Sequence, residues 1–224
     1  MITSASNPRL KLIRRLQGRA QRQRLGLFVC EGEDLVEAGR AAGAEPVDVL
    51  VGGEDVEPAL LADVSALGHP PRVIAVFRTA DLPLESGAET GLALWHVSDP
   101  GNVGTLMRTA DAFGAAVFLS AGCADPTGPK ALRASMGAIF RVPLGRFDDA
   151  PGRRIALVPR GGRPLSEVAM DGPVTFVLGA EREGLPEDVF AACDEAASIP
   201  LAAGAESLNV AAAGAIALYE RMRK

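Results

Sequence analysis

The chain has 224 residues, a net charge of −5, and 48% hydrophobic and 23% charged residues, which suits one or two globular domains. No apolar stretch of about 18 residues predicts a membrane span, and the start of the chain lacks the apolar centre of a signal peptide. The cysteines, Cys30, Cys123 and Cys193, are far apart, and only His69 and His96 are available as histidine ligands. The sequence therefore favours a reducing cytoplasm and gives little support to a metal site.

The basic residues are distributed unevenly. Residues 1–30 hold seven of the 23 basic residues and no acidic residue, so a basic arm precedes an acidic remainder. A local basic segment can neutralise nucleic-acid phosphates whatever the net charge. A solvated helix face is the alternative interpretation. The predicted phosphate contacts in this arm are Arg9, Arg14, Arg15 and Arg22.

The first part of the chain alternates helical and strand patterns. Apolar spacing predicts an amphipathic helix over 8–22, and short β-branched runs predict strands. The elements expected after that helix are a strand at 27–30, a helix at 33–42, a strand at 47–51, a helix at 58–67 and a strand at 73–77. Residues 1–78 are thus predicted to form a small α/β domain. Residues 79–91, with Pro83, Gly87 and Gly91, are predicted to be a linker.

The remaining residues, 92–224, contain short apolar runs typical of parallel strands covered on both faces. These runs are 92–97, 115–120, 139–144, 154–158 and 173–178. Helical spacing over 102–114 places Arg108 opposite an apolar stripe, with Asn102 as the expected cap. Residues 208–218 are apolar nearly all round, which indicates a helix buried on most sides and capped by Ser207.

Three separated segments carry a family resemblance. They are residues 99–110 (DPGNVGTLMRTA), 178–185 (LGAEREGL) and 199–210, which begins IPL and ends SLNV. In order and spacing they resemble the three motifs of the SpoU (TrmH) family of RNA 2′-O-ribose methyltransferases. The first 40 residues are also similar to the N-terminal substrate-binding segment of many SpoU enzymes.

The resemblance implies a fold and a reaction. The expected fold is α/β, a parallel sheet with a C-terminal deep trefoil knot of the SPOUT superfamily, preceded by a small α/β substrate-binding domain. Residues 92–224 would then bind S-adenosylmethionine (SAM) and methylate a ribose 2′-hydroxyl of RNA. A homodimer is also implied, and neither a membrane nor a metal is expected as a partner.

The resemblance also assigns site residues. It implies SAM binding by Leu178, Gly179, Ile199, Leu201 and Leu208, and a catalytic site of Arg108, Asn102, Glu181, Ser207 and Asn209. The family's usual Asn, Met and Gly are here Ala180, Leu201 and Ala203. The role of Arg108 stays open. Arginine stays protonated near neutral pH and is a poor base, so this residue acts either as a perturbed base or as a phosphate clamp that orients the hydroxyl.

A further segment, residues 125–138, also resembles the family and offers Lys130 and Arg133 to RNA phosphate, although a basic helix start is the alternative. Ribosomal RNA is favoured over transfer RNA by the N-terminal domain.

Two other functions have weaker support. The first is a Rossmann oxidoreductase, which would need a GxGxxG pattern that does not follow the strands expected at 47–51 and 92–97. The second is an inactive RNA-binding protein of the same fold, and the intact motif residues argue against it.

Overall fold

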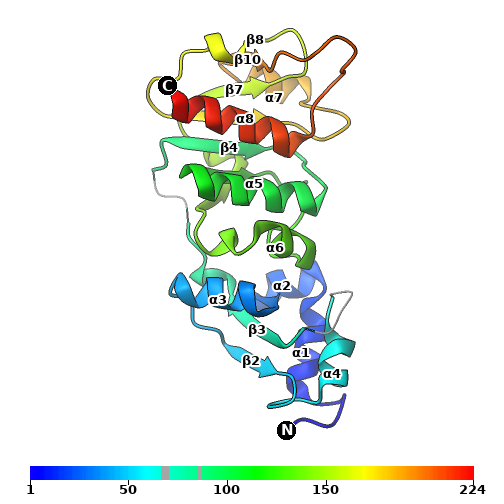
Figure 1. Cartoon of the computed structure of the whole chain (residues 1–224). Helices are drawn as coiled ribbons and strands as arrows, with labels where there is room; N and C mark the ends of the chain where they lie inside the picture. The colour runs from blue at the N-terminus through cyan, green and yellow to red at the C-terminus, as the bar shows by residue number, and fades with distance from the viewer. Residues whose placement is uncertain (67–70, 85–86) are drawn as a thin grey trace. The chain divides into compact units, whose positions relative to one another are not determined.

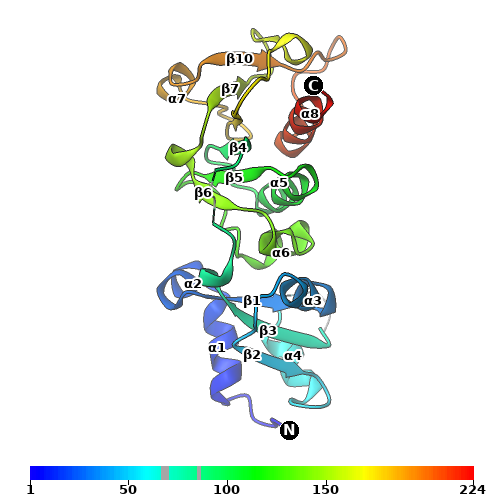
Figure 2. The same ribbon diagram turned by 90° about the vertical axis from the view of Figure 1, so that its left-hand side faces the viewer.

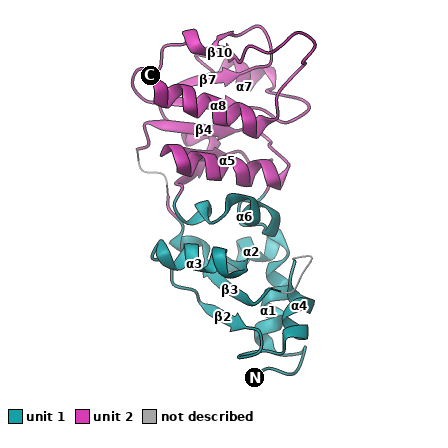
Figure 3. Cartoon of the chain, viewed as in Figure 1, with its two compact units in different colours: residues 1–82, 125–141 teal, residues 83–124, 142–224 magenta. Residues whose placement is uncertain are grey.

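The computed structural model describes residues 1–66, 71–84 and 87–224. His69, the end of the helix expected at 58–67 and part of the linker expected at 79–91 lie outside these ranges. The chain forms two compact units, one of Met1–Leu82 with Asp125–Arg141 and one of Pro83–Ala124 with Val142–Lys224 (Figure 3). The predicted organisation divides the chain once, whereas residues 125–141 pack with the first unit.

The first unit is built on a three-stranded antiparallel sheet in the order β1-β3-β2. Its strands are β1 (Leu27–Glu31), β2 (Asp48–Val51) and β3 (Val73–Arg78). Its helices are α1 (Pro8–Leu16), α2 (Arg19–Leu25), α3 (Glu33–Ala41), α4 (Pro58–Val64), the 3₁₀ turn η1 (Thr79–Asp81), and α6 (Pro129–Ser135) with the 3₁₀ turn η2 (Ala138–Phe140) from the later segment. Leu10, Ile13 and Leu16 of the predicted apolar stripe enter the core together, whereas Ala20, its fourth residue, is exposed.

The helix predicted over 8–22 is broken into α1 and α2. Gln17 is the C-cap of α1, and Gly18, which has an extended backbone, is the N-cap of α2. Arg22 Nη1 donates to the carbonyl oxygens of Leu16 and Gln17, both at 2.8 Å. A helix leaves its last carbonyls without partners, so Arg22 satisfies two groups that the break exposes.

The prediction of a strand at 139–144 is wrong for most of its length. Ala138–Phe140 forms the 3₁₀ turn η2, and a strand begins only at Leu144. The Phe140 ring packs against those of Phe28 and Phe77, with centroid distances of 5.8 and 4.9 Å. The first residues of this apolar run thus complete the core of the first unit, and only its end joins the large sheet.

The second unit is built on a seven-stranded sheet in the order β6-β5-β4-β9-β7-β10-β8, and its paired strands are parallel. The strands are β4 (Thr90–Leu94), β5 (Ala116–Leu119), β6 (Leu144–Arg146), β7 (Arg153–Leu157), β8 (Arg163–Pro164), β9 (Val174–Leu178) and β10 (Glu195–Ser198). The α/β class and the parallel sheet are confirmed, while β8 and β10 were not predicted.

Helices cover both faces of this sheet. The helices α5 (Pro100–Phe113) and α8 (Val210–Arg223) lie side by side on one face (Figure 1), and α7 (Glu187–Ala191) lies on the other (Figure 2). The 3₁₀ turns η3 (Phe147–Asp149) and η4 (Leu165–Glu167) connect strands. Gly214 of α8 sits where a Cβ would lie 3.6 Å from Leu178 and closer still to Leu106, so a small residue brings the two helices together.

Both helix caps differ from the sequence-based prediction. Asp99, not Asn102, caps α5, because its Oδ1 accepts from the N–H groups of Gly101 (2.7 Å) and Asn102 (3.0 Å). Asn209, not Ser207, caps α8. The buried stripe of α5 and the exposure of Arg108 are as predicted. Within the described ranges, no helix is both long and apolar enough to cross a bilayer.

Candidate active site

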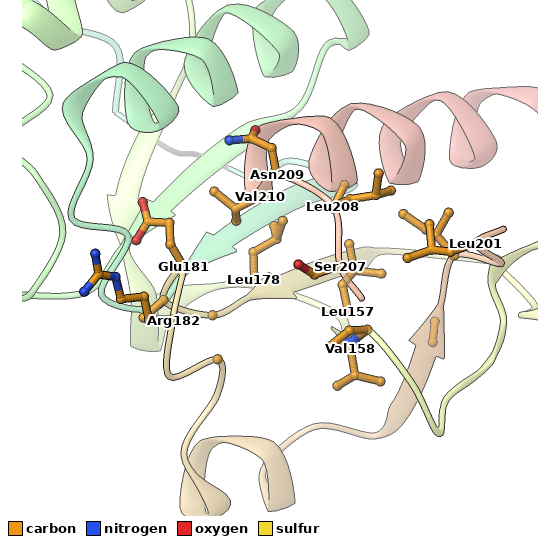
Figure 4. Close-up of a pocket in the computed structure, with 17 residues that line it drawn as sticks. Leu157, Val158, Leu178, Glu181, Arg182, Leu201, Ser207, Leu208, Asn209 and Val210 are labelled. Atoms are coloured by element: carbon orange, nitrogen blue, oxygen red, sulfur yellow. The ribbon is translucent and has the colours of Figure 1, made fainter. Parts of the chain in front are cut away.

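A cavity of about 440 Å³ opens where several strands of the large sheet end. Because the carboxyl ends of parallel strands meet at one edge, the segments that follow β7, β9 and β10 converge there. Its lining residues are Leu157, Val158, Pro159, Leu178, Gly179, Ala180, Glu181, Arg182, Gly184, Ala197, Ile199, Leu201, Ser207, Leu208, Asn209, Val210 and Ala213. Figure 4 shows Glu181 and Arg182 at one end of the cavity and Leu201 at the other.

The five residues expected to bind the cofactor all line this one cavity, although they come from two segments. Leu178, Leu201 and Leu208 give apolar walls (Figure 4). In the part of the chain that the structure describes, the backbone N–H groups of Leu201 and Leu208 have no internal hydrogen-bond partner. The cavity therefore combines apolar surface with unused peptide donors, and SAM contacts by these residues stay a prediction.

The backbone of Gly179 lies very close to another part of the chain, the backbone of residues 184 and 185. A Cβ there would lie 2.6 Å from Leu185 N and would also collide with the backbone of Gly184. Ala180 and Gly184 exchange two backbone hydrogen bonds of 3.0 Å, which closes residues 180–184 into a tight turn. Position 179 therefore requires a glycine, because a side chain there would prevent this turn from folding back on the end of β9.

A chain of hydrogen bonds joins the three motif segments. Asn209 Nδ2 donates to Asn102 Oδ1 at 3.0 Å, and Asn102 Nδ2 donates to Glu181 Oε1 at 3.1 Å. Asn209 Oδ1 also accepts from Ala211 N at 2.9 Å, so the cap of α8 fixes its amide. One residue from each segment is thus held in a fixed order beside the cavity.

Glu181 is the anionic centre of this arrangement. Its carboxylate accepts from the backbone N–H groups of Ser98 (3.3 Å) and Asp99 (3.2 Å) as well as from Asn102. Partial burial opposes ionisation, but the bond from Asn102 and the backbone N–H donors outweigh it and hold the pKa of Glu181 below its usual range. Glu181 is therefore ionised at neutral pH and acts as an acceptor that orients its donors.

The other two expected catalytic residues lie differently. Ser207 lines the cavity, in the stretch between β10 and α8. Arg108 is exposed on α5 and is not among the residues that line the cavity. The structure thus brings Asn102, Glu181, Ser207 and Asn209 together and leaves Arg108 apart from them.

Three of the predicted phosphate contacts are already engaged inside the first unit. Arg9 Nε donates to Asp48 Oδ2 at 2.9 Å, and this bond raises the pKa of Arg9. Arg14 pairs with Asp63 at 2.6 Å. The prediction that Arg22 contacts phosphate is not supported, because this residue is only 5% exposed and its Nη2 donates to Asp125 Oδ2 at 2.7 Å. Because its guanidinium is enclosed, Arg22 is a packing residue and is left out of the proposed RNA contacts.

The remaining predicted contacts are accessible. Arg15, Lys130 and Arg133 are exposed. All three belong to the first unit, because residues 125–141 pack there and not with the large sheet. The helix α6 that carries Lys130 and Arg133 thus joins the unit that contains the basic arm.

Sequence reasoning missed part of the cavity. Leu157, Val158 and Pro159 line it at the end of β7, and Arg182 lies at the same end of the cavity as Glu181. A signal was present for the first three, since ligands in parallel α/β folds bind beyond the carboxyl ends of strands and a strand was expected at 154–158.

The fold and the site define a class, a parallel α/β protein with a ligand cavity beyond its strand ends. The model of the SpoU rRNA Methylase family matches residues 89–219. An uncharacterized tRNA/rRNA methyltransferase of Synechocystis is 32% identical over 100% of this chain and 93% of its own length. The 23S rRNA (guanosine(2553)-2′-O)-methyltransferase of Bacillus subtilis is 30% identical, and 97% of each chain is covered.

A solved structure is similar over nearly the whole chain. The AdoMet-bound rRNA methyltransferase from Sinorhizobium meliloti has a TM-score of 0.87 and 30% identity, covering 99% of this chain and 97% of that one. The chain belongs to the SpoU rRNA methylase family. The resemblance carried by the three segments is therefore confirmed.

Proposed function

We propose that this chain is a SAM-dependent RNA methyltransferase that transfers a methyl group to a ribose 2′-hydroxyl of ribosomal RNA. The observation that carries the proposal is the hydrogen-bonded series Asn209–Asn102–Glu181 beside the cavity. Family membership and the named activity of the Bacillus subtilis relative support it. Glu181, Asn102, Ser207 and Asn209 form the proposed catalytic site together with Arg108.

The residues present fit SAM. A volume of about 440 Å³ lies within the range of cofactor pockets. Leu178, Leu201 and Leu208 offer apolar surface to an adenine ring, and the peptide groups of Gly179, Ile199 and Leu208 lie at the cavity wall to fix the polar parts. A cofactor that is both aromatic and strongly polar needs this combination.

The reaction requires that the ribose 2′-hydroxyl be oriented and that it lose its proton. SAM, when bound, supplies a methyl group activated by a positively charged sulfur. Methyl transfer to the ribose 2′-oxygen would break the bond between the methyl carbon and the sulfur, and the hydroxyl proton would pass to solvent water. The protein's task is to hold the 2′-oxygen in line with the methyl group. Glu181 serves this by fixing Asn102, and through it Asn209, at the cavity edge.

Arg108 is proposed to act on the RNA rather than on the cofactor. It is exposed on α5 and does not line the cavity. A planar guanidinium binds phosphate through two parallel hydrogen bonds and so orients the attached ribose. The alternative, proton removal by Arg108 itself, needs an environment that strongly lowers an arginine pKa.

The first unit is proposed to recognise RNA, with residues 1–78 as its main part. Arg15, Lys130 and Arg133 are the exposed cations assigned to phosphates. Arg9 and Arg14 are secondary contacts, because each would have to share its guanidinium with an aspartate. Such contacts are electrostatic and therefore weaken with salt.

The proposal extends to assembly and location. Ile216, Tyr219 and Met222 are 39%, 58% and 67% exposed and recur along one side of α8, so a second copy of the chain would cover an apolar stripe. Family membership supports a trefoil knot at the C-terminal end of the chain. An RNA substrate and three cysteines without a disulfide support a cytoplasmic location.

The test is to map 2′-O-methyl groups in RNA from cells with and without this protein. Loss of one ribosomal methyl group is the expected result. Loss of a transfer RNA methyl group instead would favour the tRNA alternative. An unchanged methylation map, combined with no binding of S-adenosylhomocysteine in a calorimetric titration, would favour an inactive RNA-binding protein.

A further inference from the structure

The cavity of the candidate site has one charged end. Of its 17 lining residues, all in the described part of the chain, only Glu181 and Arg182 carry charged side chains. Both lie at one end of the cavity, whereas Leu201 lies at the other (Figure 4). Arg182 is therefore the single cationic residue of the lining, and the hydrogen bonds that join Glu181 to Asn102 do not involve it.

The tight turn after β9 fixes the position of Arg182. This residue is the middle one of the turn, and the two backbone hydrogen bonds between Ala180 and Gly184, each 3.0 Å long, close the chain on both sides of it. The preceding side chain is also held, because the Glu181 carboxylate accepts from the N–H groups at 98 and 99. The base of the Arg182 side chain is therefore kept at the charged end of the cavity.

The Arg182 guanidinium has no partner inside the protein. Within the described ranges it takes part in no ion pair and no side-chain hydrogen bond, although Glu181 precedes it in the chain. By contrast, Arg9, Arg14 and Arg22 are each paired with an aspartate. Arg182 is also exposed, so its planar set of N–H donors is available to an anionic group of a ligand.

We propose that Arg182 binds the α-carboxylate of the methionine part of SAM. An α-amino acid carries one negative and one positive group, and Glu181 and Arg182 present charges of both signs side by side at one end of the cavity. A guanidinium pairs with a carboxylate through two parallel hydrogen bonds. The inference rests on the proposed function, because it takes SAM as the ligand.

This contact also gives the cofactor a direction in the cavity. The adenine ring lies toward the apolar surface of Leu201 and Leu208, and the amino-acid part lies toward Arg182 (Figure 4). A cavity built in this way distinguishes SAM from a ligand that has the same adenosine and sulfonium groups but no carboxylate. Arg182 is thus a specificity-determining residue for the cofactor.

The test compares SAM with decarboxylated SAM, which lacks only the carboxylate, by calorimetric titration of the whole chain. The wild type should bind SAM more tightly. Arg182→Gln should lower SAM affinity about 10- to 100-fold, the range for losing a hydrogen bond to a charged group. It should bind decarboxylated SAM as well as the wild type or better, because a cation beside a more positive ligand has been removed. The melting temperature should hold, since Arg182 is exposed.

Arg146→Gln is the matched control. Arg146 is an exposed arginine of the same unit that does not line the cavity, so this variant should bind both ligands as the wild type does.

Two results would overturn the carboxylate contact. One is an equal loss of affinity for both ligands in Arg182→Gln, and the other is an unchanged SAM affinity. If that unchanged affinity came with weaker RNA binding and a smaller salt slope, Arg182 would belong to an RNA phosphate instead. A preference for SAM that depends on Arg182, without methyl transfer to any RNA, would sink the proposed function and leave the carboxylate contact standing.

Discussion

Asn102 holds the candidate site together at the scale of single residues. Its amide donates to Glu181 and accepts from Asn209, so it fills both roles that an amide can play. Because Asp99 caps α5, the Asn102 side chain is free for this purpose. A residue of either pure donor or pure acceptor character would satisfy only one neighbour.

Replacing Asn102 by Ala should slow methyl transfer about 10- to 100-fold, the usual effect of losing a hydrogen bond to a charged group. The fold should persist, since Asp99 still caps the helix. Single-turnover transfer of labelled methyl groups measures the rate. Asn102→Asp is the informative companion, because it keeps the acceptor for Asn209 and places a second carboxylate against Glu181. A rate equal to wild type in both variants would remove Asn102 from the site.

The lowered pKa of Glu181 gives a pH dependence with a definite sign. Its ionised form is favoured in the folded state, so its contribution to stability is complete above the pKa of an unfolded glutamate, about 4.3. That contribution is lost as the pH falls through the lower folded pKa. Denaturant unfolding of wild type and Glu181→Gln should therefore differ at pH 7 and converge in acid. A difference that grows on acidification would contradict the assignment.

Arg108→Ala should retain the melting temperature and S-adenosylhomocysteine affinity while losing at least about tenfold in methyl transfer, because its side chain is exposed and outside the cavity. Arg108→Lys should also be slow, since lysine lacks the planar fork. The same single-turnover assay decides. Recovery of the rate by lysine would mean that positive charge alone is sufficient.

At the scale of elements, the turn after β9 depends on the absence of a side chain. Gly179→Ala should distort residues 180–184, because the new Cβ would collide with main-chain atoms that cannot rotate away. We expect a loss of about 1–3 kcal/mol in stability together with weaker S-adenosylhomocysteine binding. Gly18→Ala is the control, since its Cβ would come no closer than 3.6 Å to Arg15 O. Calorimetric titration and thermal melting provide the measurements. A Gly179→Ala variant with the affinity and melting temperature of the wild type would exclude the tight turn.

Elements with strong periodicity could be predicted from the sequence, and those set by distant partners could not. The stripe of α5 was evident because its apolar residues recur at helical spacing, and Val103, Leu106, Met107 and Ala110 are buried as expected. The strand β10 has a single buried residue, Ala197, and β8 is only two residues long, so both depend on pairing within the sheet. The caps were misplaced by two or three residues because capping depends on backbone angles that side-chain patterns do not reveal.

The candidate site shows the same division. The three segments were recognisable, and the five expected cofactor residues do line one cavity. The engagement of Arg22 by Asp125 was not visible, because the two residues are 103 positions apart in the chain. Sequence spacing likewise gave no sign that Gly179 is pressed against Gly184.

For the whole molecule, RNA binding should follow the exposed cations and not the total basic charge. Changing Arg15, Lys130 and Arg133 together to Ala should weaken RNA binding and reduce the salt slope by about 0.7–0.9 for each phosphate that the protein no longer neutralises. Stability should hardly change, since all three side chains are exposed. Filter binding over a salt series provides the measurement, and an unaltered slope would refute the assignment of these cations to phosphates.

Arg22→Ala is the contrasting variant. The two side chains of the Arg22–Asp125 pair are 6% and 13% exposed, so removal of Arg22 would leave the Asp125 carboxylate buried without its ion-pair partner. The expected cost is about 3–5 kcal/mol of stability, as for other buried pairs broken on one side. If Arg22→Ala melted like the wild type and yet bound RNA poorly, Arg22 would be a phosphate ligand after all.

The position of residues 125–141 has a consequence for synthesis on the ribosome. Domains usually fold as units in the order in which they emerge, the N-terminal one first. Here a nascent chain that ends at residue 82 lacks Asp125, the partner of buried Arg22, and Phe140, which packs on Phe28 and Phe77. The unit that begins the chain thus stays unfinished until the first strands of its neighbour, β4 and β5, have also been made.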